Sequence, residues 1–283
     1  MAQPLSADLV GRTFDPVETS WTSKDVMLYA CGVGARPPAE LDFLFEGKGP
    51  LVLPTFAVVP GMLSMGALFA AGLDINPMMI LHGEQAVTLH RPIPADCTAT
   101  VTGRVAEIWD KEKAAVLGCE GVVADADGPL FTTRATLFVR GAGGFGGERG
   151  PSTAGRNAPP ASAPDHVVED VTRPEQAAVY RLSGDRNPLH IDPSFAKMAG
   201  YQEPFIHGLC TYGFVGRAIL HTLCGGDPSR FESFEARFAD QVYPGDAVVT
   251  KLWVVGERQA IVEAETQRGN VVLSQAKATF TPA

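Results

Sequence analysis

Residues 247–280 read AVVTKLWVVGERQAIVEAETQRGNVVLSQAKATF, a stretch in which polar residues alternate with apolar and β-branched ones. Such alternation is typical of strands that bury one face. Residues 97–109 (CTATVTGRVAEIW) and 113–139 (KAAVLGCEGVVADADGPLFTTRATLFV) have the same character. Hairpin turns are expected at the glycine-containing breaks Gly118, Asp127-Gly128 and Gly269-Asn270. The sequence therefore predicts a meander of antiparallel strands in each half of the chain.

The two halves also match each other at a constant offset of 150 residues. Gly34-Ala-Arg-Pro-Pro38 corresponds to Gly184-Asp-Arg-Asn-Pro188. Thr22-Ser-Lys-Asp25 and Thr172-Arg-Pro-Glu175 both have the pattern of a capping box, in which a hydroxyl and an acid three residues later begin a helix. We expect a helix and a loop before each meander, which makes each half an α+β unit whose sheet packs on a helix.

The segment between the halves, residues 141–164, consists almost entirely of Gly, Pro, Ala, Ser and Thr and shows no apolar periodicity. We interpret it as a linker between an N-terminal unit, residues 1–140, and a C-terminal unit, residues 165–283. The apolar segments 61–72 and 208–221 are the candidates for the long helices. Residues 141–146 fit G-x-G-x-x-G, but Gly and Pro follow where a dinucleotide site would open a helix, so no nucleotide is expected there.

The composition excludes several classes of partner. Among 283 residues, 23 Lys plus Arg stand against 32 Asp plus Glu, and the net charge of -9 argues against broad binding to nucleic acid or anionic lipid. No apolar run approaches the roughly 18 residues of a membrane span, and the start lacks the pattern of an export signal. Five cysteines without a C-x-x-C pair suit a reducing cytoplasm rather than a disulfide or zinc framework. No metal and no prosthetic group are expected.

Candidate catalytic residues lie in the second copy of the repeated break. Asp185 and His190 flank a turn that contains Asn187, and a carboxylate and an imidazole directed at one water can exchange acid and base roles at neutral pH. The alternative is a helix end with an incidental surface histidine. The repeat favours function, because the first copy has Ala35 and Pro37 where the second has Asp185 and Asn187. One active site per chain is expected.

Gly208 stands at the start of the second apolar segment. A backbone amide at a helix N-terminus can donate to a carbonyl oxygen that gains negative charge, and glycine lets a ligand approach closely. His207, which precedes it, is expected to be a structural residue at the helix start.

Longer motifs around these residues resemble a known family. SGDRNPLHIDPSFA followed by PFIHGLCTYGF is similar to the signature of MaoC-like (R)-specific enoyl-CoA hydratases, or hydratase 2. YACGVGA, LPTFAVVPGM, LHGEQAVTLHRPIP, GGFGGERG and ARFADQVYPGD resemble the two-repeat class of this family, which includes the hydratase 2 domain of peroxisomal multifunctional enzyme type 2. The resemblance covers almost the whole chain.

The resemblance implies a double hotdog fold, in which each repeat wraps an antiparallel sheet around a central helix. The family's catalytic pair falls on Asp185 and His190, its turn asparagine on Asn187 and its carbonyl-binding amide on Gly208. Contacts to acyl-CoA fall on His82, Gly83, Lys111 and Phe238. The family's first repeat lacks the catalytic pair and accommodates the acyl tail.

The implied activity is the reversible hydration of a trans-2-enoyl-CoA to the (3R)-3-hydroxyacyl-CoA, with water as second substrate and no cofactor. A freestanding bacterial cytoplasmic enzyme is expected, and a homodimer is compatible with the resemblance. Three alternatives stay open: dehydration of a 3-hydroxyacyl group on acyl carrier protein, a hotdog thioesterase, and a non-catalytic module that binds acyl thioesters.

Overall fold

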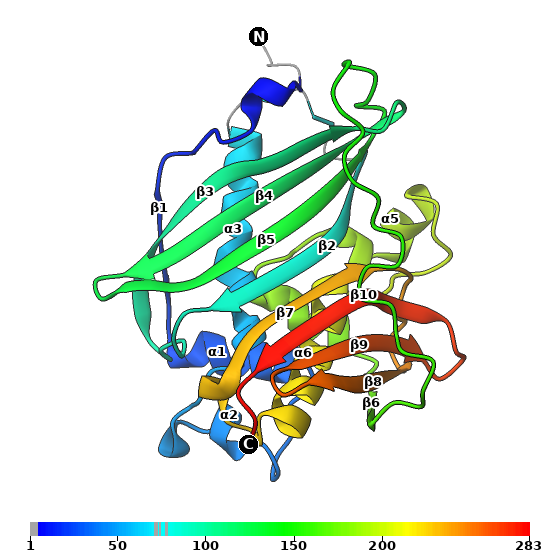
Figure 1. Ribbon diagram of the computed structural model, residues 1–283. Helices are drawn as coiled ribbons and strands as arrows, with labels where there is room; N and C mark the ends of the chain where they lie inside the picture. The colour runs from blue at the N-terminus through cyan, green and yellow to red at the C-terminus, as the bar shows by residue number, and fades with distance from the viewer. Residues whose placement is uncertain (1–4, 71–72, 74, 77–78) are drawn as a thin grey trace.

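The computed structural model describes residues 5–70, 73, 75, 76 and 79–283. Within these residues, ten strands form one antiparallel sheet in the order β1-β3-β4-β5-β2-β7-β10-β9-β8-β6 (Figure 1). The strands are β1 Val17–Trp21, β2 Ile80–Leu89, β3 Cys97–Asp110, β4 Ala114–Asp125, β5 Gly128–Arg140, β6 His166–Val171, β7 Phe231–Phe238, β8 Ala247–Gly256, β9 Gln259–Thr266 and β10 Val271–Phe280.

The strand order of the first half recurs in the second half in the reverse direction across the sheet. The first five strands lie in the order β1-β3-β4-β5-β2 and the last five in the order β7-β10-β9-β8-β6. Strands β2 and β7 join the halves, with pairing that runs from Glu84 opposite Arg237 to Thr88 opposite Ser233. The predicted meanders are confirmed as β3-β4-β5 and β8-β9-β10, whereas the sequence did not predict β1, β2, β6 and β7 as strands.

The helices lie on one side of the sheet, with α3 behind the strands of the first half and α6 behind those of the second (Figure 1). They are α1 Ser23–Gly32, α2 Leu41–Leu44, α3 Val58–Ala70, α4 Gln176–Tyr180, α5 Pro193–Met198 and α6 Gly208–Leu223. The long helices α3 and α6 begin 150 residues apart and correspond to the two apolar segments, of which residues 71 and 72 lie outside the described chain. Each half is a helix wrapped by a five-stranded antiparallel sheet, which confirms the α+β double hotdog fold.

Aromatic side chains fill the core between helices and sheet, and one aromatic pair joins the two halves. Tyr29 of α1 lies beside Tyr180 of α4, with ring centroids 6.1 Å apart. Phe56 packs edge-on against Tyr29, while Tyr212 of α6 stacks on Phe234 of β7 at 4.4 Å. All five are buried, and burying a side chain of this size contributes about 1.5–3 kcal/mol of hydrophobic stabilisation.

Only one of the two predicted capping boxes is formed. The Thr22 amide donates to the carboxylate of Asp25 at 2.8 Å, and α1 begins as expected. The Thr172 hydroxyl instead donates to the carbonyl of Asp246 at 2.8 Å, and α4 begins later, at Gln176. Thr172 therefore fastens the chain to the turn before β8, and the prediction of a second capping box was wrong.

Gly118 lies inside β4 and not in a turn, so this part of the hairpin prediction was wrong, while the turns at Asp127-Gly128 and Gly269-Asn270 are confirmed. A Cβ atom at Gly118 would lie 2.5 Å from Cγ of Glu107 on β3. The pairing of β3 with β4 shifts register at the same place. Glycine is therefore required beside this β-bulge, because a side chain at position 118 would collide with Glu107.

Residues 141–164, here called the strap, contain neither helix nor strand, but hydrogen bonds fix them along the outer face of the sheet (Figure 1). The carboxylate of Asp110 accepts the amides of Gly144 at 2.8 Å and Gly146 at 2.9 Å. Further along, Arg156 pairs with Glu84 at 2.7 Å, and the Trp253 indole donates to the carbonyl of Ser162. The strap therefore crosses the β2–β7 junction instead of passing through solvent.

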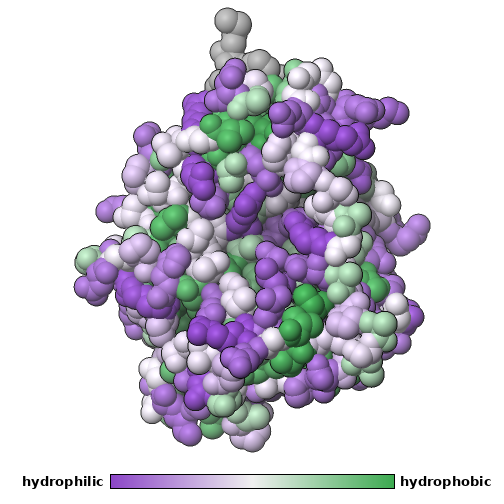
Figure 2. Space-filling model, in the orientation of Figure 1, coloured by the Kyte–Doolittle hydropathy of each residue, from purple (hydrophilic) through white to green (hydrophobic). Residues whose placement is uncertain are grey.

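Hydrophilic residues cover most of the outer face, and apolar residues form only small separate groups on it (Figure 2). Ion pairs also link neighbouring strands, including Arg104 with Glu120 at 2.7 Å and Arg134 with Glu107 at 2.8 Å. Among the described residues, none of the helices has the length and apolar character needed to cross a lipid bilayer.

Candidate active site

The turn after α4 has the tight and irregular form that its sequence predicts. Gly184 ends the preceding 3-10 turn with φ 134°, a left-handed value that favours glycine. The amide of Asn187 then donates to the Asp185 carboxylate at 3.1 Å, and the Asn187 side chain accepts from the Leu189 amide at 3.0 Å. Asn187 thereby caps the short 3-10 helix η6, Pro188–His190, and holds the chain between Asp185 and His190 in one conformation.

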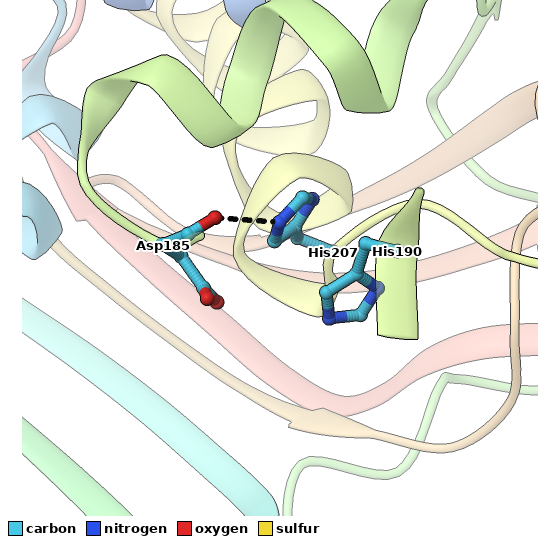
Figure 3. A group of neighbouring side chains, drawn as sticks. All are labelled: Asp185, His190 and His207. Atoms are coloured by element: carbon cyan, nitrogen blue, oxygen red, sulfur yellow. Dashed lines mark hydrogen bonds between the residues drawn. The ribbon is translucent and has the colours of Figure 1, made fainter. Parts of the chain in front are cut away.

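Asp185 and His190 come together as predicted, and His207 lies with them (Figure 3). One nitrogen or carboxylate oxygen from each residue lies within 4.8 Å of those from the other two. His190 Nδ1 is 2.9 Å from the carbonyl of Phe205. A carbonyl can only accept, so Nδ1 carries the proton and Nε2 of the neutral ring is left as an acceptor.

Burial lowers the pKa of His190, against opposing effects of the Phe205 carbonyl and the charge on Asp185. Its imidazole is therefore neutral at neutral pH and can take a proton from a bound water. The group of Asp185, His190 and His207 also has the residue types of a metal site. His190 Nδ1 and His207 Nε2 face backbone carbonyls at 2.9 and 3.1 Å, which fixes the tautomer of each ring.

Gly208 is the first residue of α6, and its exposed backbone faces the same cleft. An amide in the first turn of a helix has no carbonyl acceptor within that helix, so this donor is available to a ligand. A Cβ atom at position 208 would lie 3.0 Å from Cδ1 of Phe238. The glycine thus keeps open the space between the helix start and the Phe238 ring.

The cleft that contains these groups has a volume of about 1410 Å³ and is lined by both repeats. All eight residues that the sequence and the family resemblance nominated line it: His82, Gly83, Lys111, Asp185, Asn187, His190, Gly208 and Phe238. Strap residues line it as well, namely Arg149, Gly150, Pro151, Ser152, Thr153 and Arg156. That the strap borders the cleft could not be predicted, because composition does not indicate where an irregular segment lies.

The first-repeat residues are brought to the cleft by β2 and by the β3–β4 hairpin. His82 packs edge-on against Phe238 at 5.1 Å, and burial lowers the pKa of His82 to about 4, so its ring is uncharged. Gly83 lies where the pairing of β2 with β5 shifts register. The Lys111 amine donates to the carbonyl of Arg149 in the strap.

In the first repeat, the position that matches His190 is occupied by Glu40. Its carboxylate accepts from Arg217 of α6 at 2.8 and 2.9 Å and lies 2.9 Å from His221 Nε2. Burial raises the pKa of Glu40, but the hydrogen bonds from His221 and Arg217 outweigh it and hold the pKa at about 2. Ala35, which matches Asp185, is buried. The first repeat therefore uses these positions for an ion pair and for packing, and the ion pair of Glu40 was not predicted from the sequence.

Comparison with known proteins adds two kinds of finding. Residues 156–276 match the family described as "MaoC like domain", and residues 20–141 match the family described as "MFE-2 hydratase 2 N-terminal domain". The enoyl-CoA hydratase ChsH3 of Mycobacterium tuberculosis is 42% identical, over 96% of this chain and 97% of that protein. A probable enoyl-CoA hydratase 2 of Dictyostelium discoideum is 36% identical, over 97% and 96% of the two chains.

Among solved structures, a MaoC-like dehydratase from Phytophthora capsici superposes with a TM-score of 0.87 and 32% identity, and the match covers 98% of both chains. The similarity thus extends over both repeats and the strap, and not over the catalytic turn alone.

Proposed function

The chain belongs to the MaoC-like hydratase 2 family, and from this premise we propose that Asp185 and His190 catalyse the hydration of a trans-2-enoyl-CoA. The enzyme is a hydro-lyase that interconverts trans-2-enoyl-CoA and (3R)-3-hydroxyacyl-CoA. The observation that carries the residue assignment is the convergence of Asp185 and His190 beside the free amide of Gly208 in one cleft.

The catalytic pair acts on a single water molecule. His190 Nε2 and the Asp185 carboxylate are both acceptors, so they can hold the water and remove its proton as its oxygen attacks C3. The same pair then delivers a proton to C2, so hydroxyl and hydrogen add across the double bond and no proton is left over. Asn187 supports the pair because its backbone N–H donates a hydrogen bond to the Asp185 carboxylate at 3.1 Å.

The Gly208 amide polarises the thioester. Attack at C3 moves electron density onto the thioester oxygen, and a fixed N–H at a helix N-terminus stabilises this enolate-like charge. Because the charge develops only as the reaction proceeds, this hydrogen bond strengthens in the transition state and raises kcat rather than affinity alone.

His82, Gly83, Lys111 and Phe238 are proposed to contact the acyl-CoA. Their positions along the cleft support this assignment. The Lys111 amine would exchange its bond to the Arg149 carbonyl for a phosphate or ribose oxygen. The first repeat is proposed to receive the acyl tail, since Met62 and Met65 of α3 line the same cleft as the catalytic pair.

We further propose a bacterial cytoplasmic setting. All five cysteines are free, as a reducing compartment favours, and a full-length relative occurs in Mycobacterium tuberculosis. A homodimer belongs to the same proposal.

Loss of enoyl absorbance when the purified protein meets a panel of trans-2-enoyl-CoAs tests the function directly, with the stereochemistry of the product read by a (3R)-specific or (3S)-specific dehydrogenase. A parallel assay with the carrier-protein thioester separates the enzyme from a carrier-dependent dehydratase. Release of free thiol from a saturated acyl-CoA would instead indicate a thioesterase, and tight binding without turnover of any thioester would contradict catalysis.

A further inference from the structure

His207 is the residue that the mechanism leaves unused, although it lies at the centre of the site. Only 1% of its surface is exposed. Its ring lies against that of His190, with centroids 3.9 Å apart and planes inclined at 32° (Figure 3). The ring of Tyr180 also contacts it, at a centroid distance of 5.0 Å. A ring enclosed in this way has one available orientation.

The hydrogen bonding of His207 fixes its protonation. Nε2 lies 3.1 Å from the backbone carbonyl of Asp185, which can only accept, so Nε2 carries a proton. Nδ1 is buried and has no hydrogen-bond partner among the described residues, so a second proton there would be an unpaired buried charge. Burial and the neighbouring His190 accordingly lower the pKa of His207 to about 4.

This bond connects two parts of the site that lie 22 residues apart in sequence. Asp185 belongs to a turn that projects from the end of α4, and its carboxylate is otherwise held by the Asn187 amide within that same turn. His207 immediately precedes Gly208, so the bond ties the backbone of Asp185 to the start of α6. The carboxylate and the amide donor are thereby kept at a fixed separation.

We propose that His207 is a positioning residue, which holds the Asp185 carboxylate in register with the Gly208 amide by donating a hydrogen bond to the Asp185 carbonyl. The proposal rests on the proposed function. His207 itself transfers no proton, because Nε2 is committed to the carbonyl and Nδ1 faces no solvent. Its contribution is to kcat, since displacement of a reacting group by about 1 Å can cost about 10²-fold.

A matched pair of variants tests this role. His207→Gln places an amide NH₂ near the position of Nε2 and keeps the donor, while His207→Met has a similar length and no donor. We expect kcat for crotonyl-CoA to fall about 10- to 100-fold in His207→Met and to stay within a few-fold of the parent in His207→Gln. The dissociation constant of a saturated acyl-CoA, which does not react, should be unchanged in both.

Three results would overturn the proposal: parental kcat in folded His207→Met, equal losses in both variants, or a loss of melting temperature with kcat per folded molecule unchanged. Nitrogen NMR of the histidine-labelled parent provides a check that needs no variant, because His207 should be a neutral ring protonated at Nε2 at neutral pH. A charged ring, or one protonated at Nδ1, would also refute it. Absence of hydration by the parent itself would refute the proposed function and leave this spectroscopic test standing.

Discussion

Replacement of Gly208 by proline removes one hydrogen-bond donor from the site with little change elsewhere. Position 208 is the first residue of α6, where proline is favoured and where the amide has no intrahelical partner. The preceding residue, His207, has φ -60° and ψ 140°, which is the extended conformation that a residue before proline adopts. We therefore expect Gly208→Pro to fold.

The Cβ atom that proline adds needs its own control. A Cβ atom at position 208 would lie 3.0 Å from Cδ1 and 3.2 Å from Cε1 of Phe238, so the ring must move by a few tenths of an ångström. Gly208→Ala introduces the same Cβ and keeps the amide. Because Phe238 is proposed to contact the substrate, crowding should act mainly on KM, and it should do so in both variants.

The difference between the two variants then isolates the donor. Removal of one oxyanion donor typically costs about 10² to 10³ in kcat, or about 2.7–4 kcal/mol of transition-state stabilisation. We expect kcat for crotonyl-CoA hydration to be lower in Gly208→Pro than in Gly208→Ala by this factor. The two melting temperatures should agree within a few degrees. If folded Gly208→Pro turns over as fast as Gly208→Ala, the amide of Gly208 is not the carbonyl donor.

Three other outcomes follow from the site and from its counterpart in the first repeat. Asp185→Asn and His190→Ala should each lower kcat by about 10² to 10⁴. Because both groups act on one water, the double variant should be barely slower than the slower of the two single variants. Multiplicative losses would mean that the two residues have independent roles. Glu40→Gln should lower the free energy of unfolding in urea by about 3–5 kcal/mol without changing kcat per folded molecule. Since the pKa of Glu40 is lowered from 4.5 to about 2, its contribution to the free energy of unfolding is present above pH 4.5 and disappears as the pH falls toward 2. A difference in unfolding free energy between parent and variant that stays constant over this range would refute the ion-pair account. Ala35→Asp with Pro37→Asn, made in the Asp185→Asn protein, should restore no hydration, because Glu40 stands where a second histidine would be needed; recovered turnover would contradict this.

The sequence predicted the parts of the fold that depend on local pattern. Alternating residues identified the two meanders, and the 150-residue offset identified two equivalent units. Strands β2 and β7 escaped prediction, and β2 is interrupted near Gly83 by a register shift with β5 that disturbs its alternation. The second capping box failed for a similar reason, since the Thr172 hydroxyl is used by a turn 74 residues away.

The candidate site shows the same division. Residue types and the repeat singled out Asp185 and His190, and the helix start singled out Gly208. The role of His207 had no signal in the sequence beyond its place before Gly208, because its partner is a backbone carbonyl, which any residue type supplies. The composition of the strap predicted only that it lacks regular structure. Its residues border the cleft because of the tertiary fold.

The carboxylate of Glu40 bears on how such an enzyme diverges. In an assembly of two identical hotdog chains, every substitution enters both copies at once, so an acid at this position would delete the histidine from each active site. Two copies encoded in one gene escape this restriction. One repeat can lose its histidine and bind Arg217 of the other repeat through Glu40. Each later substitution then changes one repeat only. After this substitution, separating the two repeats would leave Glu40 and Arg217 each without its charge partner, so the duplication is difficult to reverse.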